Sequence, residues 1–213
     1  MSWELLSEEE ILATFTGVFE RGWNSIKLYF MIGLPTETLD DERAIVTLVD
    51  KIRALGKEVT GRLIQIRVNA SAFVPKPHTP FQWIACDSVE SIEAKQRLLR
   101  KELSGPGMKL NWTDPKDSLL EAWLSRGDRR MAQIIYLAWK KGARFDAWQD
   151  QDNFAVWQEA FTEAGLDPAF YSHRTRSLDE VFPWDHIHSG VTKRFLAEDY
   201  RWSLEGKTRK DCR

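Results

Sequence analysis

Apolar residues follow two different patterns at the start of the chain, and each pattern predicts a different element. The segment from Ile26 to Ile32 is almost entirely apolar, which is typical of a strand covered on both faces, as in a parallel sheet. Before and after it, apolar residues return every three or four positions, the spacing of one helix face. We therefore expect one helix after the acidic start at Ser7, ending at Gly22, and a second from Leu39 to Gly56.

The next stretch, residues 62–74, alternates apolar and polar residues, which predicts a strand with two unlike faces. In an open antiparallel sheet the polar face would meet water, whereas in a parallel barrel it would point into the lumen, where ligands bind. The helix–strand rhythm before it favours the barrel. The apolar face holds Ile64, Ile66, Val68, Ala70, Ala72 and Val74, and the other face holds Gln65, Arg67, Asn69, Ser71 and Phe73.

The rest of the chain predicts mostly helices. A helix is expected from Asp87, which forms a capping-box pattern with Glu90, and a short strand is expected at 108–112. Further helices are expected at about 116–126, 128–141, 151–164 and 191–205. The predicted fold is α/β: a partial (β/α) barrel over residues 1–115, then a mainly α-helical, tryptophan-rich region over residues 116–213.

Composition and charge narrow the function classes. Of the 213 residues, 43% are apolar and 29% are charged, which is ordinary for a globular protein. The net charge of −2 argues against a surface that coats nucleic acid broadly. No apolar stretch has the length of a membrane span, and the first residues lack the pattern of a signal peptide. We therefore expect a cytoplasmic protein without membrane association.

The two cysteines, Cys86 and Cys212, form neither a disulfide framework nor a metal-ligand spacing. Cys86 is expected to be a small packing residue near a helix start. Cys212 lies one residue before the end of the sequence and could be a ligand only as part of a motif in a longer chain. No metal site is predicted within this chain.

The turn between Gly33 and Glu37 is the first candidate for ligand binding. Glycine allows the backbone to approach a ligand closely, and the helix that follows offers unpaired N–H groups. The carboxylate of Glu37 could accept hydrogen bonds from a ribose or an amine, or could cap its own helix. The spacing leaves both roles open.

Residues 27–38, Lys-Leu-Tyr-Phe-Met-Ile-Gly-Leu-Pro-Thr-Glu-Thr, resemble the fifth-strand segment of radical S-adenosylmethionine (radical SAM) enzymes. In that family, a strand ending in Gly-x-Pro-x-Glu lies beside the adenosine part of the cofactor. Residues 68–83 look like the sixth strand and exit loop of the same barrel. Residues 120–130 and 182–187 are similar to parts of an uncharacterised subgroup that often carries a cobalamin-binding domain.

The resemblance implies a set of site residues at the carboxyl ends of these strands. Glu37 would steady the hydrogen bonds near the cofactor, and His78 would lie on the exit loop as a hydrogen-bonding residue rather than a general base. Arg67 and Asn69 would line the lumen, or would form a polar layer that satisfies itself. The implied S-adenosylmethionine contacts are Gly33, Pro35, Glu37, Arg67, Asn69, Ser71, Val74 and Pro75, with Lys76 and His78 at the substrate mouth.

The chain departs from this family at the cluster site. Radical SAM enzymes bind a four-iron–four-sulfur cluster through Cys-x3-Cys-x2-Cys, and this sequence has no such triplet. We therefore expect the C-terminal part of a radical SAM enzyme, inactive by itself, whose partner is an N-terminal half that carries the cluster. The complete enzyme would cleave its cofactor reductively to a 5′-deoxyadenosyl radical. The resemblance does not identify the substrate, for which RNA and protein are the candidates.

The alternative is a non-catalytic module, derived from such an enzyme, that binds protein or RNA. Its candidate surface is the densest group of basic residues, whose neighbouring acidic residues favour an ordinary solvated helix face instead. Asp185, His186 and His188 form a short cluster that also invites a metal site, although a structural role is favoured. The basic group consists of Arg126, Arg129, Arg130, Lys140, Lys141 and Arg144.

Overall fold

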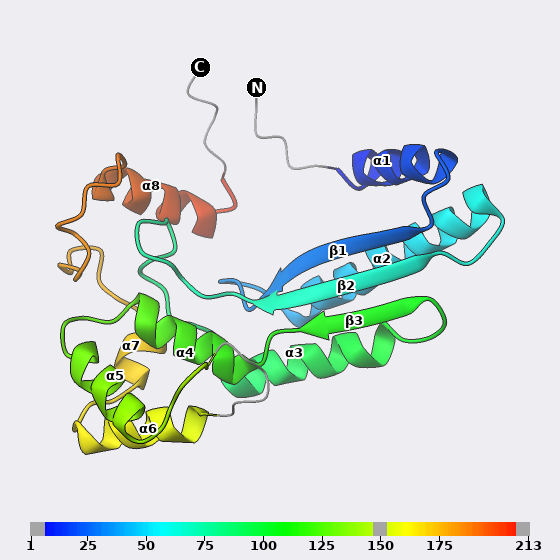
Figure 1. The fold of residues 1–213 in the computed structure, drawn as a ribbon. Coiled ribbons are helices and arrows are strands. Elements are labelled where there is room, and N and C mark those ends of the chain that lie inside the picture. Colours follow the sequence, from blue (N-terminus) through cyan, green and yellow to red (C-terminus); the bar gives the residue numbers. More distant parts are fainter. Residues whose placement is uncertain (1–6, 147–152, 208–213) are drawn as a thin grey trace. The chain divides into compact units, whose positions relative to one another are not determined.

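The computed structural model describes residues 7–146 and 153–207, which form two compact units (Figure 1). The first unit contains the described residues up to 72 together with 90–113, and the second contains 73–89 and those between 114 and 207. The elements of the first unit are α1 (Glu8–Glu20), β1 (Ser25–Ile32), α2 (Leu39–Thr60), β2 (Gln65–Ala72), α3 (Val89–Glu102) and β3 (Met108–Trp112).

The first unit is built on a parallel sheet with the strand order β1-β2-β3. The central strand pairs with both neighbours in a regular register, in which Val68 lies between Leu28 and Leu110. The strand–helix alternation that sequence predicted is therefore confirmed, and the chain belongs to the α/β class. β3 adds a strand beyond the two that the radical SAM resemblance assigns.

The helices of this unit pack on one face of the sheet. Ile66, Val68 and Ala70 of β2 form one buried cluster with residues of α1, α2 and α3, among them Phe19 and Ile52. The alternation in residues 62–74 correctly predicted this apolar face, although the strand is shorter than predicted and ends at Ala72. On β2, the opposite face carries the polar side chains.

β1 differs from its prediction. Its apolar run predicted cover on both faces, but Tyr29 is 69% exposed and Met31 is 50% exposed. These side chains alternate with Leu28, Phe30 and Ile32, which face the helices, so they lie on the face that no helix of this unit covers.

α2 also differs, because it continues through Gly56 and ends at Thr60, with Gly61 in the left-handed conformation as its cap. Gly56 is buried inside the helix. A Cβ atom there would lie 2.4 Å from the Cδ1 atom of Ile64, so this glycine permits close packing of the helix on the chain that enters β2. Its role is steric rather than a stop signal.

The second unit is helical, as predicted. Trp123, Trp157, Phe161 and Tyr171 lie in one buried cluster, and Trp83, Phe182 and Trp184 lie in another, so most of these aromatic residues are core. The elements are α4 (Pro115–Ser125), α5 (Met131–Lys140), α6 (Phe154–Glu163), α7 (Ala169–Ser172) and α8 (Lys193–Leu204). Residues 151 and 152 of the predicted helix 151–164 lie outside the described residues, as does Cys212.

Candidate functional site

The loop after β1 is closed by Glu37. The backbone N–H of Gly33 donates to Oε1 of Glu37 at 2.7 Å, and that of Leu34 donates to Oε2 at 3.2 Å. Gly33 and Thr36 both have positive φ angles, of 83° and 67°, which produce the tight turn. The side chain of Glu37 therefore shapes the loop, while α2 is capped separately by Thr38 and Asp41.

A buried charge network holds this loop to the helices. Nζ of Lys95, on α3, lies 2.6 Å from Oε1 of Glu37 and 3.8 Å from Oε1 of Glu42 on α2. The exposed fractions of these side chains are 8% for Lys95, 7% for Glu37 and 0% for Glu42. Charges this deeply buried must be paired, because an isolated ion costs several kcal/mol to remove from water.

The two carboxyl groups differ in proton affinity. Burial, together with a hydrogen bond to Glu37, raises the pKa of Glu42 to about 7. Burial also acts to raise the pKa of Glu37, but hydrogen bonds from Glu42, Lys95 and the loop backbone outweigh it and lower that pKa. The Glu42 oxygens accept no hydrogen bond from the described residues, so a shared proton between the two carboxyl groups is the arrangement that satisfies both.

The uncovered face of the sheet carries polar residues in rows across the three strands. Asn69 lies between Tyr29 and Asn111, and the amide nitrogen of Asn111 donates to the amide oxygen of Asn69 at 3.0 Å. Two residues earlier on each strand, Arg67 lies between Lys27 and Lys109. Ser71 follows at the carboxyl end, where it is exposed opposite Met31.

The structure thus places Arg67, Asn69 and Ser71 on one face of the sheet, which is the face that the alternation assigned to ligands. The alternative prediction, a polar layer whose side chains hydrogen-bond to one another, fits Asn69, which accepts a hydrogen bond from Asn111. That alternative does not fit Arg67, whose side chain forms no hydrogen bond or ion pair with the residues that the structure describes. Gly33, Pro35 and Glu37 lie in the loop that leaves the same sheet at the end of β1.

The remaining predicted site residues belong to the second unit. Val74 is buried against Cys86 and Ala122, and Pro75 is also buried. Lys76 forms an ion pair with Glu121 on α4. Val74 and Pro75 belong to a different unit from the Glu37 loop and the sheet. Their contact with a cofactor bound at the sheet therefore stays a prediction.

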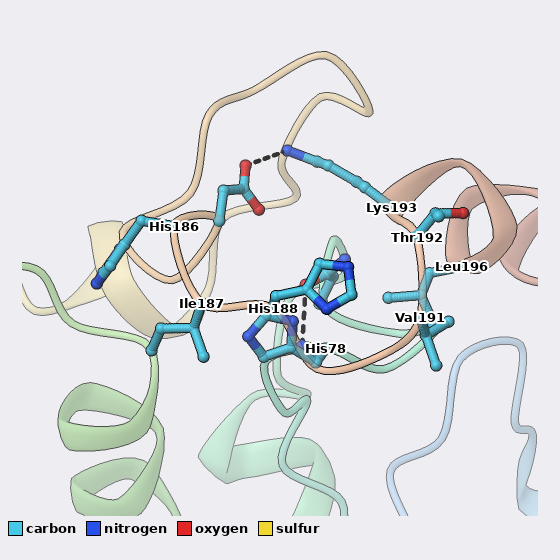
Figure 2. Close-up of a pocket in the computed structure, with 10 residues that line it drawn as sticks. His78, His186, Ile187, His188, Val191, Thr192, Lys193 and Leu196 are labelled. Carbon is cyan, nitrogen blue, oxygen red and sulfur yellow. Dashed lines mark hydrogen bonds and ion pairs between the residues drawn. The ribbon is translucent and has the colours of Figure 1, made fainter.

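His78 lines a pocket of the second unit together with residues 185–196 (Figure 2). Its backbone N–H donates to Oε1 of Gln82, which also accepts from the indole of Trp184, at 3.1 and 2.8 Å. Nε2 of His78 is buried without a partner, and no hydrogen bond from the described residues holds Nδ1, so no orienting group prepares this ring as a base. Figure 2 shows His186 pointing away from the other two histidines.

The Asp185 cluster is structural in this pocket. The carboxylate of Asp185 accepts from the backbone N–H of Phe182 at 2.9 Å and pairs with Lys193 at 2.5 Å. No group of three or more His, Cys, Asp or Glu side chains is placed to hold a metal ion anywhere in the described residues.

The basic group on the helical region is largely engaged. Arg126 is 1% exposed and donates to the carbonyl oxygens of Ile84 and Ser172, at 2.7 and 3.4 Å. Arg130 pairs with Asp128 at 2.6 Å, and Lys141 pairs with Glu159 and Glu163. Arg126 is therefore a core residue and not part of a surface for RNA.

Sequence reasoning missed Glu42 and Lys95, the two residues that pair with Glu37. A signal for them exists, because both occupy positions on the apolar stripes of their helices, Glu42 near Ile45 and Val49, and Lys95 near Ile92 and Leu99. A charged residue on such a stripe is buried with a partner or faces away. Sequence reasoning also missed Lys27, Lys109 and Asn111, because only the pairing register of the three strands brings them beside Arg67 and Asn69.

Comparison with known proteins gives one informative similarity. Over 114 residues, which are 54% of this chain, it is 32% identical to the uncharacterised protein MJ0966 of Methanocaldococcus jannaschii. The aligned part is 24% of that protein, so the chain spans about a quarter of the relative's length. No family model matches the chain, and no solved structure matches it. The helices in the described parts are all too short or too polar to cross a membrane.

Proposed function

We propose that this chain supplies the closing strands and helical region of a radical SAM enzyme, while another polypeptide segment carries the cluster-binding cysteines. The observation that carries the proposal is the architecture of the first unit. Its strands follow one another in sequence order, and its helices all pack on one face. A barrel wall has this arrangement, with helices outside and the other face of each strand toward the lumen, whereas a doubly wound sheet has helices on both faces.

The open face supports the proposal in a second way. Parallel sheets occur almost only with both faces covered. The exposed Tyr29 and Met31 are apolar side chains on the uncovered face of this sheet. Strands from the cluster-bearing segment, arranged around the same lumen, would enclose them. The similarity to part of a longer archaeal protein is compatible with such a larger assembly.

The residues of this chain do not fit an iron–sulfur cluster. Cys86 is buried, burial raises the pKa of its thiol, and the described residues hold no three-ligand group. We therefore assign this chain only the binding and orientation of the cofactor. For the nucleoside part the fit is better, because the open face offers the exposed Tyr29 ring beside the Asn69 and Asn111 amides, next to the loop that Glu37 holds.

Co-expression with a polypeptide that carries Cys-x3-Cys-x2-Cys provides the test. The complex should bind S-adenosylmethionine, measured by equilibrium dialysis, and Asn69→Ala or Glu37→Ala should weaken that binding about tenfold through lost hydrogen bonds. Thr47→Ala, on the exposed surface of α2, is the matched control and should leave the affinity unchanged. Unchanged affinity in both site variants would overturn the assignment of the site.

A second candidate, an RNA-binding module, is favoured by one observation on α5. Tyr136 and Trp139 are 58% and 52% exposed, their ring centroids lie 6.0 Å apart, and the guanidinium of Arg144 lies 5.4 Å from the Trp139 ring. Exposed aromatic rings beside arginine can stack on single-stranded RNA. Trp139→Ala should then abolish binding to a single-stranded oligonucleotide, and replacing Arg129 and Arg130 should flatten its salt dependence. Binding that persists in both variants would exclude this function.

A further inference from the structure

Three basic residues lie side by side on the open face of the sheet. Register places Lys27, Arg67 and Lys109 opposite one another on β1, β2 and β3, and all three are exposed. Because neighbouring strands are about 4.8 Å apart, the outer two backbones are separated by only about 10 Å. Side chains of this length can therefore converge on a single small ligand.

This row has no compensating acid. The strand positions on the same face hold Ser25, Tyr29, Met31, Gln65, Asn69, Ser71 and Asn111, none of which is acidic. Among the described residues, neither Arg67 nor Lys109 forms an ion pair, and the ammonium of Lys27 lies only over the Tyr29 ring, 4.9 Å from its centroid. Like charges directly opposite each other on a sheet are destabilising, so the row costs folding free energy unless an anion binds there.

From this row we infer a binding site for a small molecule that bears two or more phosphate groups. A single carboxylate satisfies one or two cations, whereas a compact polyphosphate has oxygens for all three. The central position is held by arginine, whose planar guanidinium binds phosphate oxygens in pairs, and the flanking lysines supply point charges.

This inference goes beyond the proposed function and does not depend on it. S-adenosylmethionine carries no phosphate, so the cation row would hold a different molecule, such as a phosphorylated substrate. The site needs only the sheet of the first unit. A failure to bind phosphate would leave the radical SAM proposal standing, and a failure to bind the cofactor would leave this site standing.

Isothermal titration calorimetry of the whole chain with inorganic pyrophosphate and tripolyphosphate, at about 0.15 M salt, tests the site. We expect saturable binding, tighter for tripolyphosphate, that Arg67→Gln weakens about tenfold or more, with smaller losses in Lys27→Gln and Lys109→Gln. Lys57→Gln removes the same charge from an exposed position on α2 and should leave the affinity unchanged. An equal loss of affinity in Lys57→Gln would show that binding depends only on the net charge of the protein, and would overturn the site.

Thermal unfolding gives a second readout that separates binding from folding. Without ligand, Arg67→Gln should melt no lower than the unsubstituted protein, because it relieves repulsion within the row. Tripolyphosphate should raise the melting temperature of the unsubstituted protein but not of Arg67→Gln. The inference is overturned if polyphosphate does not bind saturably. It is also overturned if the protein binds a single-stranded oligonucleotide but does not bind polyphosphate.

Discussion

Nζ of Lys95 lies 2.6 Å from Oε1 of Glu37, and this contact ties α3 to the loop that leaves β1. Both side chains are nearly fully buried, and Glu42 of α2 lies beside them without exposure. The same carboxylate accepts the backbone N–H of Gly33. One small network therefore fixes the loop at the carboxyl end of the sheet to two helices.

Replacing Lys95 with methionine should destabilise the protein strongly. The change leaves the Glu37 and Glu42 carboxyl groups buried without their cation, which typically costs about 3–5 kcal/mol. Urea unfolding measures this loss. Lys101→Met on the same helix removes an exposed ammonium, and its free energy of unfolding should change by about 0.5 kcal/mol at most. Similar losses in the two variants would show that the Lys95 network does not carry stability.

Glu42 should make stability depend on pH near neutrality. Its pKa is raised to about 7 in the folded protein from an ordinary value of 4.5. The folded state therefore binds this proton more tightly than the unfolded chain. The resulting stability is fully present below about pH 4.5 and is lost as pH rises through about 7. The lowered pKa of Glu37 acts in the opposite direction, with stability lost as pH falls below the ordinary value.

Glu42→Gln isolates this contribution, because glutamine keeps the shape but does not titrate. The unsubstituted protein should lose up to about 3 kcal/mol more than Glu42→Gln between about pH 5 and pH 7.5. Urea unfolding at a series of pH values gives both curves. Parallel curves across this range would contradict the raised pKa of Glu42.

Gly107 should tolerate alanine less well than Gly61, although both have positive φ angles, of 76° and 69°. A Cβ atom at Gly107 would lie 2.5 Å from the carbonyl oxygen of Ile64, whereas nothing lies within 4 Å at Gly61. Gly61→Ala should cost about 1 kcal/mol for the left-handed backbone alone, and Gly107→Ala should cost more than about 2 kcal/mol. Denaturant unfolding compares them, and equal costs would rule out the close approach of the chain entering β3 to that entering β2.

Arg126 should act as a stability residue of the second unit. Its guanidinium donates to the carbonyl oxygens of Ile84 and Ser172 and lies 3.7 Å from the sulfur of Cys86. Arg126→Met leaves the buried carbonyl oxygen of Ile84 without its donor, while that of Ser172 keeps the backbone N–H of Cys86, and the change should cost about 1–3 kcal/mol in urea unfolding. Arg129→Met, at an exposed position in the same turn, should be nearly neutral. A nearly neutral Arg126→Met would show that these hydrogen bonds do not stabilise the second unit.

Local patterns predicted much of the first unit. The alternation from Ile64 to Ala72 identified which face of β2 packs under helices, because a strand has only two faces and one of them was apolar. Periodicity also located α4, α5, α6 and α8 of the second unit, but not the short α7. In contrast, it placed the end of α2 at Gly56, since a glycine demanded by packing against Ile64 looks the same in sequence as a glycine that caps a helix.

The site was predictable only where its residues follow one another in sequence. Glu37 was identified from its turn, but Lys95 lies 58 residues later, and only the packed helix brings them together. The row of Lys27, Arg67 and Lys109 depends on strand order and register, which no single strand encodes. Arg126 was taken for a surface residue because its acceptors are backbone carbonyl groups, which any sequence offers.

The central claim is that the open face of the sheet is the inner wall of a larger assembly. Hydroxyl-radical footprinting of Tyr29 and Met31, in the chain alone and in the complex with the cluster-bearing polypeptide, tests it most directly. We expect both side chains to be labelled in the chain alone and protected in the complex, while labelling of the exposed Trp139 provides the reference. Equal labelling of Tyr29 and Met31 in the two samples, with the complex intact, would contradict the account.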